Sequence, residues 1–268
     1  MKRVKLTVAY DGTNYCGWQT QSNGVAVQDV LNQHLSELLG EPIETIGASR
    51  TDAGVHALGN VAVFDTAHRM PAEKISYALN TRLPEDIKIQ KSEEVDGDFH
   101  PRYVSSVKTY EYKILNCQMP IPTLRNYAHF TYVPLDVDKM RQGAQYLIGE
   151  HDFKSFCGTG AQVKTTVRHV LDIQFAKDGN LITMSIKGKG FLYNMVRIIA
   201  GTLMEVGRGK YPPEYVAEIL AAYDRVIAGP TAPARGLTLV GIAYENPHES
   251  ISENPHETAH EIVSGTVL

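Results

Sequence analysis

The sequence predicts an α+β fold made of two related halves, with a mainly antiparallel mixed sheet flanked by helices. Two observations predict it. Short stretches in which apolar and polar residues alternate, the period of a half-buried strand, recur along the chain with single helical stretches between them. This order of hairpin-like strand pairs and helices then occurs a second time. We expect the halves to cover residues 1–103 and 104–245.

The first half opens on a strand over residues 3–11, where valine, leucine and tyrosine alternate with polar residues. Apolar residues recur at helical spacing over residues 27–39, and Gly40 ends that helix. The further elements expected in this half are strands over residues 43–49, 60–66 and 86–95 and a helix over residues 70–84.

The second half contains a hairpin, in which strands over residues 167–176 and 180–188 flank the turn KDGN. A helix over residues 135–149 has an aspartate near its start and Gly149 at its end. The remaining elements expected are strands over residues 107–115, 126–133 and 236–244 and helices over residues 191–207 and 212–224.

The composition is ordinary for a soluble globular protein. No stretch resembles a transmembrane span or a secretory signal, so the cytoplasm is the expected compartment. Cys16, Cys117 and Cys157 are odd in number and widely spaced, which favours reduced thiols over a disulfide framework or a structural zinc site.

The formal net charge of −4 comes from the C-terminal end of the 268-residue chain. Residues 245–268 contain five glutamates and no lysine or arginine, so the rest of the chain is near neutral. A nucleic-acid partner would therefore need a local basic patch rather than a global positive field. Residues 246–268 contain few apolar residues and, together with Glu245, a repeated ENPHE stretch, and we expect them to form a disordered acidic tail. Their histidines are interpreted as solvated, with a metal site as the alternative.

The stretch ASRTDAGVHA, residues 48–57, places Asp52 in a turn between two expected strands. One interpretation is an ordinary turn, where aspartate and glycine are common. The other is a catalytic carboxylate, which a nearby guanidinium such as that of Arg50 keeps ionised and able to act as nucleophile or base. These residues by themselves identify no reaction.

Tyr110 and Tyr112 lie on one face of an expected strand, with Lys108 and Lys113 beside them. The two tyrosines are interpreted either as core residues or as an aromatic platform on which an RNA base stacks. In the second case the lysines would contact phosphates.

Arg197 lies among apolar residues of an expected helix, after a loop that contains Lys187 and Lys189. A charge buried there needs a partner, and Asp52 is the candidate, while a snorkelling surface arginine is the alternative. Other basic residues are interpreted as solvated: Arg102, Arg125, Arg168, Arg208 and Lys210. The sequence has no dinucleotide fingerprint, phosphate-binding loop, zinc-protease motif or serine-hydrolase motif, so it gives no support for a cofactor.

Several stretches resemble, in order, the landmarks of the tRNA pseudouridine synthase A family. They are DGTNYCGWQTQ, GASRTDAGVHA, LNTRLPEDI, DFHPRYVSSVKTYEYKI, HDFKSF, GFLYNMVRIIAGTLMEVGRGK and TAPARGLTLVGIAY. The resemblance covers residues 3–245. Pro101 and Thr238 depart from the family pattern, and neither is a candidate site residue.

The resemblance implies two halves around a continuous sheet with a central cleft. It implies an isomerase that converts uridine to pseudouridine at positions 38, 39 and 40, on the 3′ side of the tRNA anticodon stem–loop. It further implies that the enzyme needs no metal or organic cofactor. The implied partners are tRNA and a second copy of the chain, in a homodimer.

The resemblance also implies roles for individual residues. Asp52 would be the catalytic aspartate, and Arg50 would help to hold the target uridine flipped out of its stack. Tyr110 would stack on the base and could assist proton transfer, and Arg197 would pair with Asp52. The RNA contacts expected besides Tyr110 and Arg50 are Lys108, Arg168 and Lys189.

Two other functions remain open at this point. A tRNA-binding protein of the same fold without catalysis is disfavoured by the presence of Arg50, Asp52, Tyr110 and Arg197 together. A small-molecule hydrolase that uses Asp52 with Arg50 would need a second acid or base, and no paired carboxylate has a suitable spacing.

Overall fold

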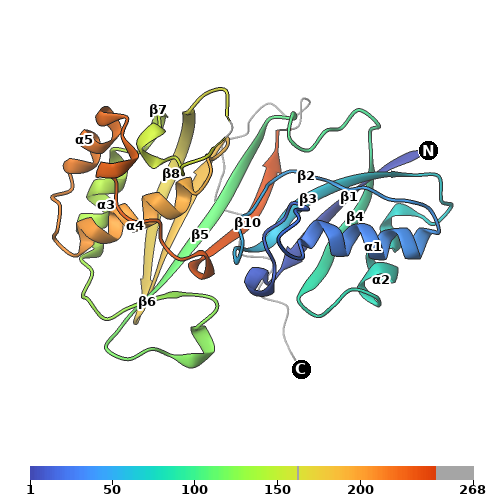
Figure 1. Cartoon of the computed structure of the whole chain (residues 1–268), viewed down its shortest axis with the longest axis horizontal. Coiled ribbons are helices and arrows are strands. Elements are labelled where there is room, and N and C mark those ends of the chain that lie inside the picture. The colour runs from blue at the N-terminus through green and yellow to red at the C-terminus, as the bar shows by residue number, and fades with distance from the viewer. Residues whose placement is uncertain (162, 246–268) are drawn as a thin grey trace.

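The computed structural model describes residues 1–161 and 163–245, and these residues have the predicted α+β fold (Figure 1). Within them, ten strands form one mixed sheet and five α-helices pack against it. The tail predicted over residues 246–268 lies outside the described residues. No helix of the described part is both long and apolar enough to cross a membrane.

The strands are β1 (Lys2–Tyr10), β2 (Ile46–Gly47), β3 (His56–Thr66), β4 (Ile87–Val95), β5 (Ser106–Asn116), β6 (His129–Thr131), β7 (Gly149–Asp152), β8 (Val167–Asp178), β9 (Leu181–Gly188) and β10 (Leu237–Tyr244). The helices are α1 (Val27–Leu39), α2 (Ala72–Asn80), α3 (Val137–Gln145), α4 (Met195–Gly207) and α5 (Tyr215–Ala222).

The sheet runs through the whole described molecule in the order β4-β1-β3-β10-β5-β9-β8-β7, with β2 beside β3 and β6 beside β5. Its pairings are antiparallel except β10 with β3 and β5 with β6, which confirms the expectation of a mainly antiparallel mixed sheet. The helices form two groups, α1 and α2 beside β1–β4, and α3–α5 beside β5–β9 (Figure 1). Strand β10 lies between the two groups and joins them into one sheet.

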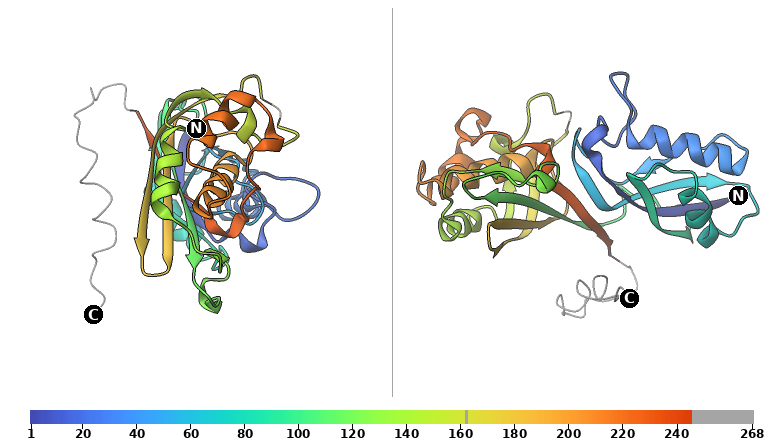
Figure 2. Two further views of the ribbon diagram at one scale, coloured as in Figure 1. Left: turned by 90° about the vertical axis from the view of Figure 1, so that its left-hand side faces the viewer. Right: turned by 90° about the horizontal axis from the view of Figure 1, so that it is seen from below.

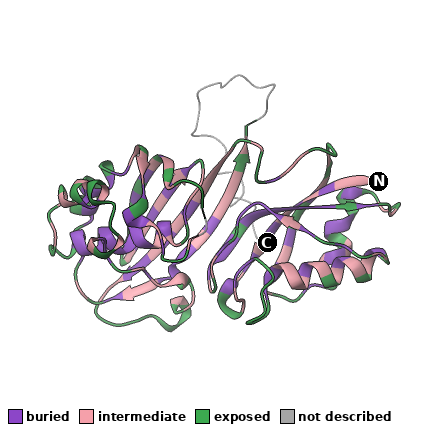
Figure 3. Ribbon diagram, turned by 45° about the horizontal axis from the view of Figure 1, so that its top comes forward, coloured by how far each residue is buried: buried purple, intermediate pink, exposed green. Residues whose placement is uncertain are grey.

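The core lies between the helices and one face of the sheet. Buried and half-buried residues alternate along β9, because one of its faces packs on helices and the other does not. Figure 2 shows α4 and α5 on one side of strands β8 and β9, and Figure 3 shows buried segments concentrated where helices meet the sheet. Every residue of α4 is buried except Arg197, which is partly exposed.

The second strand is much shorter than the strand predicted over residues 43–49. Only Ile46–Gly47 pairs with β3. The amide of Ile43 donates instead to Ser36 Oγ at 2.9 Å, and the amide of Thr45 donates to Asn32 Oδ1 at 2.9 Å. These side chains of α1 use backbone donors that a longer strand would need.

The strand predicted over residues 60–66 begins earlier, at His56, and two other parts of the strand prediction were also wrong. The strand predicted over residues 126–133 is limited to β6, because residues 124–128 turn back and the amides of Tyr127 and Ala128 both donate to Leu124 O. Strand β7 was not predicted: only its first residue, Gly149, lay in an expected element, the helix over residues 135–149, and that helix stops at Gln145.

Three further helices, besides α3, are shorter than predicted. The helix expected over residues 191–207 begins at Met195, because Asn194 has a left-handed backbone with φ of 59°. The helices expected over residues 70–84 and 212–224 are Ala72–Asn80 and Tyr215–Ala222. The spacing of apolar residues locates the first residue of a helix poorly, and all three helices begin later than predicted.

A loop, residues 228–232, packs directly on the backbone of α4. A Cβ added at Gly201 would lie 1.8 Å from Pro230 O, so only glycine allows this approach. The amide of Gly229 donates to Thr202 Oγ1 at 2.9 Å, and the amide of Ala232 donates to Arg197 O at 3.1 Å. The loop therefore holds Ala232 beside Arg197.

We expect Gly201→Ala to lower the free energy of unfolding by about 1–3 kcal/mol, because the added methyl group overlaps the loop backbone. At an ordinary helix position the same change would stabilise the protein. Urea unfolding measures the difference. In the control Gly97→Ala the added Cβ meets nothing within 4 Å, so stability should not fall. Equal or higher stability of Gly201→Ala would show that the loop does not press on α4.

Candidate active site

A cleft of about 1280 Å³ lies between the two parts of the fold. One wall comes from the residues after β2 and the other from β5, β8 and the segment before α4. The candidate site residues that line it are Arg50, Asp52, Lys108, Tyr110, Arg168 and Lys189. The sequence therefore identified residues of both walls, although they are far apart along the chain.

Asp52 lies in a tight turn that leads into β3. The amide of Val55 donates to Asp52 O at 3.1 Å, and Gly54 has φ of 76°, a conformation that favours glycine. The N-terminal loop supports the turn from behind, since the amide of Trp18 donates to Thr51 O at 3.1 Å. Trp18 is itself fully buried.

A buried polar network fixes the strand residues on either side of this turn. Tyr10 Oη and Thr51 Oγ1 are 2.7 Å apart. Asn60 Nδ2 donates to Ser49 O at 3.1 Å, and the amide of Ser49 donates to Asn60 Oδ1 at 3.3 Å. Sequence reasoning missed this network; its one signal is an asparagine at the start of the apolar stretch NVAVF. These hydrogen bonds fix the backbone on both sides of the turn, while the buried Ser49 hydroxyl has no partner among the described residues.

Arg197 Nη1 donates to Asp52 Oδ2 at 3.1 Å, so the structure brings together the two residues that the sequence suggested as a pair. The guanidinium is held by two further acceptors. Nη1 also donates to Asn194 Oδ1 at 2.8 Å, and Nε donates to Ala232 O at 2.7 Å. Asn194 was not predicted, although an asparagine three residues before Arg197 was visible in the sequence.

Burial and ion pairing act against each other at Asp52. Its side chain is 19% exposed and that of Arg197 is 17% exposed. Burial raises the pKa of Asp52 above its ordinary value, and the charge and hydrogen bond of Arg197 oppose that rise. The arrangement therefore holds a carboxylate in a partly desolvated site with its charge balanced by one guanidinium.

Arg50 does not take part in this pair. Its side chain is exposed in the cleft, and no hydrogen bond or ion pair joins it to Asp52 in the described part of the chain. The expectation that Arg50 is the guanidinium that keeps Asp52 ionised was wrong, because the turn directs the carboxylate toward α4.

The two tyrosines of β5 have different surroundings. Tyr112 is fully buried and donates to Pro233 O at 2.9 Å, so it is a core residue. Tyr110 lines the cleft, and its ring meets Phe191 edge to face with centroids 5.3 Å apart. Burial raises the pKa of Tyr110 to about 12, and the negative charge of Asp52 adds to the shift. Tyr110 is therefore a protonated phenol at neutral pH.

Lys108 also lines the cleft and donates to Ala48 O at 3.0 Å. Burial lowers the pKa of Lys108 to about 8, and the nearby charges of Arg102 and Arg50 lower it further. Arg102, interpreted from the sequence as solvated, thus lies at the cleft beside two predicted RNA contacts.

The remaining basic residues divide between the cleft and the outer surface. Arg168 Nη1 donates to Thr165 O at 3.0 Å, and Lys189 Nζ lies 3.6 Å from Glu245 Oε1 at the cleft. Arg208 and Lys210 pair with Glu205 away from it. The basic residues that line the cleft are Arg50, Arg102, Lys108, Arg168 and Lys189, and the acidic ones are Asp52 and Glu150. A local basic patch is therefore present in a chain of net negative charge.

Among the described residues no group of three histidine, cysteine, aspartate or glutamate side chains is arranged to hold a metal ion. All three cysteines are free thiols, as predicted.

A sequence model of the tRNA pseudouridine synthase family matches residues 6–104 and 144–245. The chain belongs to this family. Its members are isomerases that convert uridine to pseudouridine.

Relatives named tRNA pseudouridine synthase A match the chain over almost all of the described length. The proteins of a Thermoanaerobacter species and of Acetivibrio thermocellus are each 48% identical over 244 residues, which is 91% of this chain and 100% of the relative. The protein of Ruminiclostridium cellulolyticum is 49% identical over 245 residues, again 91% of this chain and 100% of the relative.

We expect Arg197→Met to raise the pKa of Asp52 further, because burial then acts without an opposing charge. Activity that requires the carboxylate should fall by about a hundredfold near neutral pH. The acid limb of the pH–activity profile should also move to higher pH, which measurements of pseudouridine formation across a pH series would show. Arg208→Met is the matched control, since Arg208 ends the same helix and pairs with Glu205. An unmoved acid limb in Arg197→Met would contradict the role of the pair.

The lowered pKa of Lys108 predicts a pH dependence of RNA binding. Near pH 7 the amine is mostly protonated, and above about pH 8 it must take up a proton to meet a phosphate. We therefore expect the Kd for tRNA to rise about tenfold from pH 7 to pH 9. Filter binding at constant ionic strength measures it. Lys108→Arg stays charged over this range and should show no such rise; the same rise in both proteins would assign it to another group.

Proposed function

We propose that this protein converts uridine to pseudouridine in tRNA at positions 38, 39 and 40, on the 3′ side of the anticodon stem–loop. We further propose that it acts as a homodimer in the cytoplasm, without metal or organic cofactor. The boundary between the two halves of the chain is proposed to lie between residues 103 and 104. The observation that carries the proposal is the carboxylate of Asp52, desolvated in the cleft with Arg197 as its single ion-pair partner in the described chain.

The walls of the cleft support a flipped nucleotide as the ligand. Tyr110 and Phe191 form an aromatic corner next to Asp52, where the face of a base can stack. Five basic side chains surround it and can contact phosphates on either side of the flipped nucleotide. Because a base inside a duplex is out of reach of Asp52, the target must leave its stack, which costs roughly a few kcal/mol.

The reaction rearranges bonds within one nucleotide. The bond between N1 of uracil and C1′ of ribose breaks, the base rotates in the cleft, and a bond between C5 and C1′ forms. The proton on C5 leaves to solvent, and N1 gains one, so no redox partner is required. Asp52 can attack the base or the ribose, or remove a sugar proton. The protonated phenol of Tyr110 stacks on the base and can pass a proton.

The proposed roles follow the cleft residues. Asp52 is the catalytic residue, Arg197 balances its charge, and Arg50 holds the flipped uridine. Lys108, Arg168 and Lys189 bind the RNA backbone. Glu150 is the single other carboxylate among the described cleft residues, and it belongs to β7 on the opposite wall. A hydrolase would need a second acid or base beside Asp52, so this arrangement favours the isomerase.

Tritium release tests the proposal against a protein that only binds tRNA. The substrate is tRNA with tritium on C5 of its uridines, and the comparison is between the wild type and Asp52→Asn, which preserves the side-chain shape. We expect release by the wild type at positions 38, 39 and 40 and a rate at least about a thousandfold lower for the variant.

Both proteins should bind tRNA, and filter binding serves as the control. If the wild type binds tRNA but releases no tritium, this protein is a non-catalytic tRNA binder. Release that maps to other uridines would refute the proposed positions and leave the isomerase activity.

A further inference from the structure

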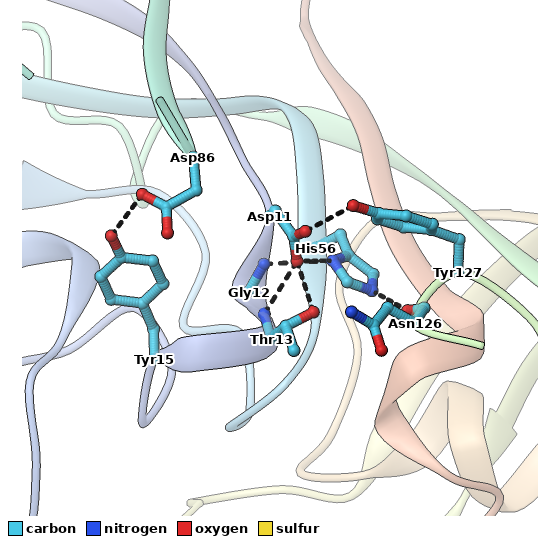
Figure 4. Close-up of polar contacts among 8 residues, drawn as sticks. All are labelled: Asp11, Gly12, Thr13, Tyr15, His56, Asp86, Asn126 and Tyr127. Carbon is cyan, nitrogen blue, oxygen red and sulfur yellow. Dashed lines mark hydrogen bonds and ion pairs between the residues drawn. The ribbon is translucent and has the colours of Figure 1, made fainter. Parts of the chain in front are cut away.

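A second group of polar side chains connects the two parts of the fold behind the turn that contains Asp52 (Figure 4). It joins the end of β1 and the start of β3 to the segment between the short helix η2 (Pro122–Leu124) and β6. Its members are Asp11, His56, Asn126 and Tyr127, and none of them lines the cleft. Their contact with substrate is therefore indirect at most.

Asp11 is the acceptor at the centre of this group. Oδ1 accepts hydrogen bonds from the amide and the hydroxyl of Thr13, at 2.9 and 2.5 Å. Oδ2 accepts from the Tyr127 hydroxyl at 2.6 Å, across the boundary between the two parts. Burial raises the pKa of Asp11, but these hydrogen bonds outweigh burial and leave it below its ordinary value. The carboxylate is thus ionised at neutral pH.

His56 makes the second connection across the boundary. Nε2 lies 2.8 Å from Asn126 O, and because a carbonyl only accepts, Nε2 carries the proton and donates. Nδ1 lies 3.1 Å from the amide nitrogen of Gly12 and 3.1 Å from Asp11 Oδ1, so the ring also contacts the central carboxylate. The imidazole also packs on the Tyr127 ring, with centroids 5.3 Å apart. His56 is 5% exposed, so these contacts are shielded from water.

The residues that follow Asp11 support the turn directly. A Cβ added at Gly12 would lie 2.0 Å from Val55 O, so the backbone of Gly12 rests on the end of the turn. Three residues further on, Tyr15 O accepts from the amide of Gly54 at 3.3 Å. Tyr15 is held in turn by its hydroxyl, which donates to Asp86 Oδ1 at 2.6 Å (Figure 4). A shift of Asp11 would therefore be transmitted to the turn through residues 12–15.

We propose that Asp11, His56 and Tyr127 form a clamp between the two parts of the fold that positions the turn of Asp52, and that Asp11 and Tyr127 are positioning residues for catalysis. This inference rests on the proposed function. At this point β3 and β10 pair through only two residue pairs, His56 with Thr238 and Ala57 with Leu239. The clamp adds side-chain connections at the place where the sheet itself connects the parts least.

Because Asp11 and Tyr127 are partly exposed, loss of their hydrogen bond should affect the reaction rate more than the stability of the fold. The Tyr127 residue is 47% exposed and the Asp11 side chain is 27% exposed, so their hydrogen bond adds little to global stability. The rate of a reaction depends far more steeply on the position of its carboxylate, since small displacements from reactive geometry are costly.

Tyr127→Phe tests the clamp, because it removes one hydroxyl and keeps the ring that packs on His56. We expect kcat to fall about tenfold with KM within about twofold of the wild type. Amide hydrogen exchange should become faster in residues 51–56 and in residues 11–18 and stay unchanged elsewhere. Tyr132→Phe is the matched control: Tyr132 is 65% exposed and its hydroxyl makes no hydrogen bond within the described residues, so neither readout should change.

A double-mutant cycle shows whether Asp11 acts through Tyr127. Asp11→Asn should lower kcat, and adding Tyr127→Phe to it should cost less than Tyr127→Phe does in the wild type. Fully additive effects would mean that the two residues act separately, which overturns the clamp.

Wild-type kcat and wild-type exchange in Tyr127→Phe would also overturn it. So would faster exchange spread evenly over the whole chain, because that is the signature of a merely structural contact. If the wild type forms no pseudouridine, the proposed function fails by itself, and local exchange in residues 51–56 then decides the clamp.

Discussion

The structure of the site depends on the ion pair between Asp52 and Arg197, in which the guanidinium opposes the rise in pKa that burial causes at the carboxyl group. The two residues come from different parts of the fold, and each is supported from its own side. Arg197 is the partly exposed residue of an otherwise buried helix, fixed by the carbonyl of Ala232 and the side chain of Asn194. The turn of Asp52 rests on the N-terminal loop. Segments on both sides of the cleft therefore hold the ion pair between Asp52 and Arg197 in place.

The spacing of apolar residues predicted the long helices and strands, because an element with one buried face needs apolar residues at regular intervals. Strands β1, β5, β8, β9 and β10 and helix α1 agree with the sequence to within a few residues. Periodicity failed at β2, where side chains of α1 bind the neighbouring amides, at β6, where a local turn shortens the strand, and at β7, which it did not predict. Nothing in residues 43–49 shows that Asn32 and Ser36 will bind their amides. The order of strands, with β10 between β3 and β5, is likewise set by contacts far apart along the chain.

The site was predictable where an unusual residue stands out against its surroundings. Arg197 in an apolar helix demanded a partner, and Asp52 provides one. The backbone carbonyl of Ala232 carries no sequence signal at all, and Asn194 matters through a left-handed backbone that no spacing reveals. Arg50 is close to Asp52 in sequence and makes no contact with its carboxylate among the described residues, because nearness along the chain does not fix the direction of a side chain in a turn.

Strand β10 has a consequence for how the enzyme is made. It is the last strand of the described chain, yet it lies in the middle of the sheet, with β3 on one side and β5 on the other. A ribosome completes both neighbours long before the strand that joins them. The growing chain thus carries its aspartate and its arginine in two parts that no continuous sheet yet joins, and the cleft is assembled as one of the last events of synthesis. A chain that stops before Leu237 has every candidate site residue and no continuous sheet to hold them together.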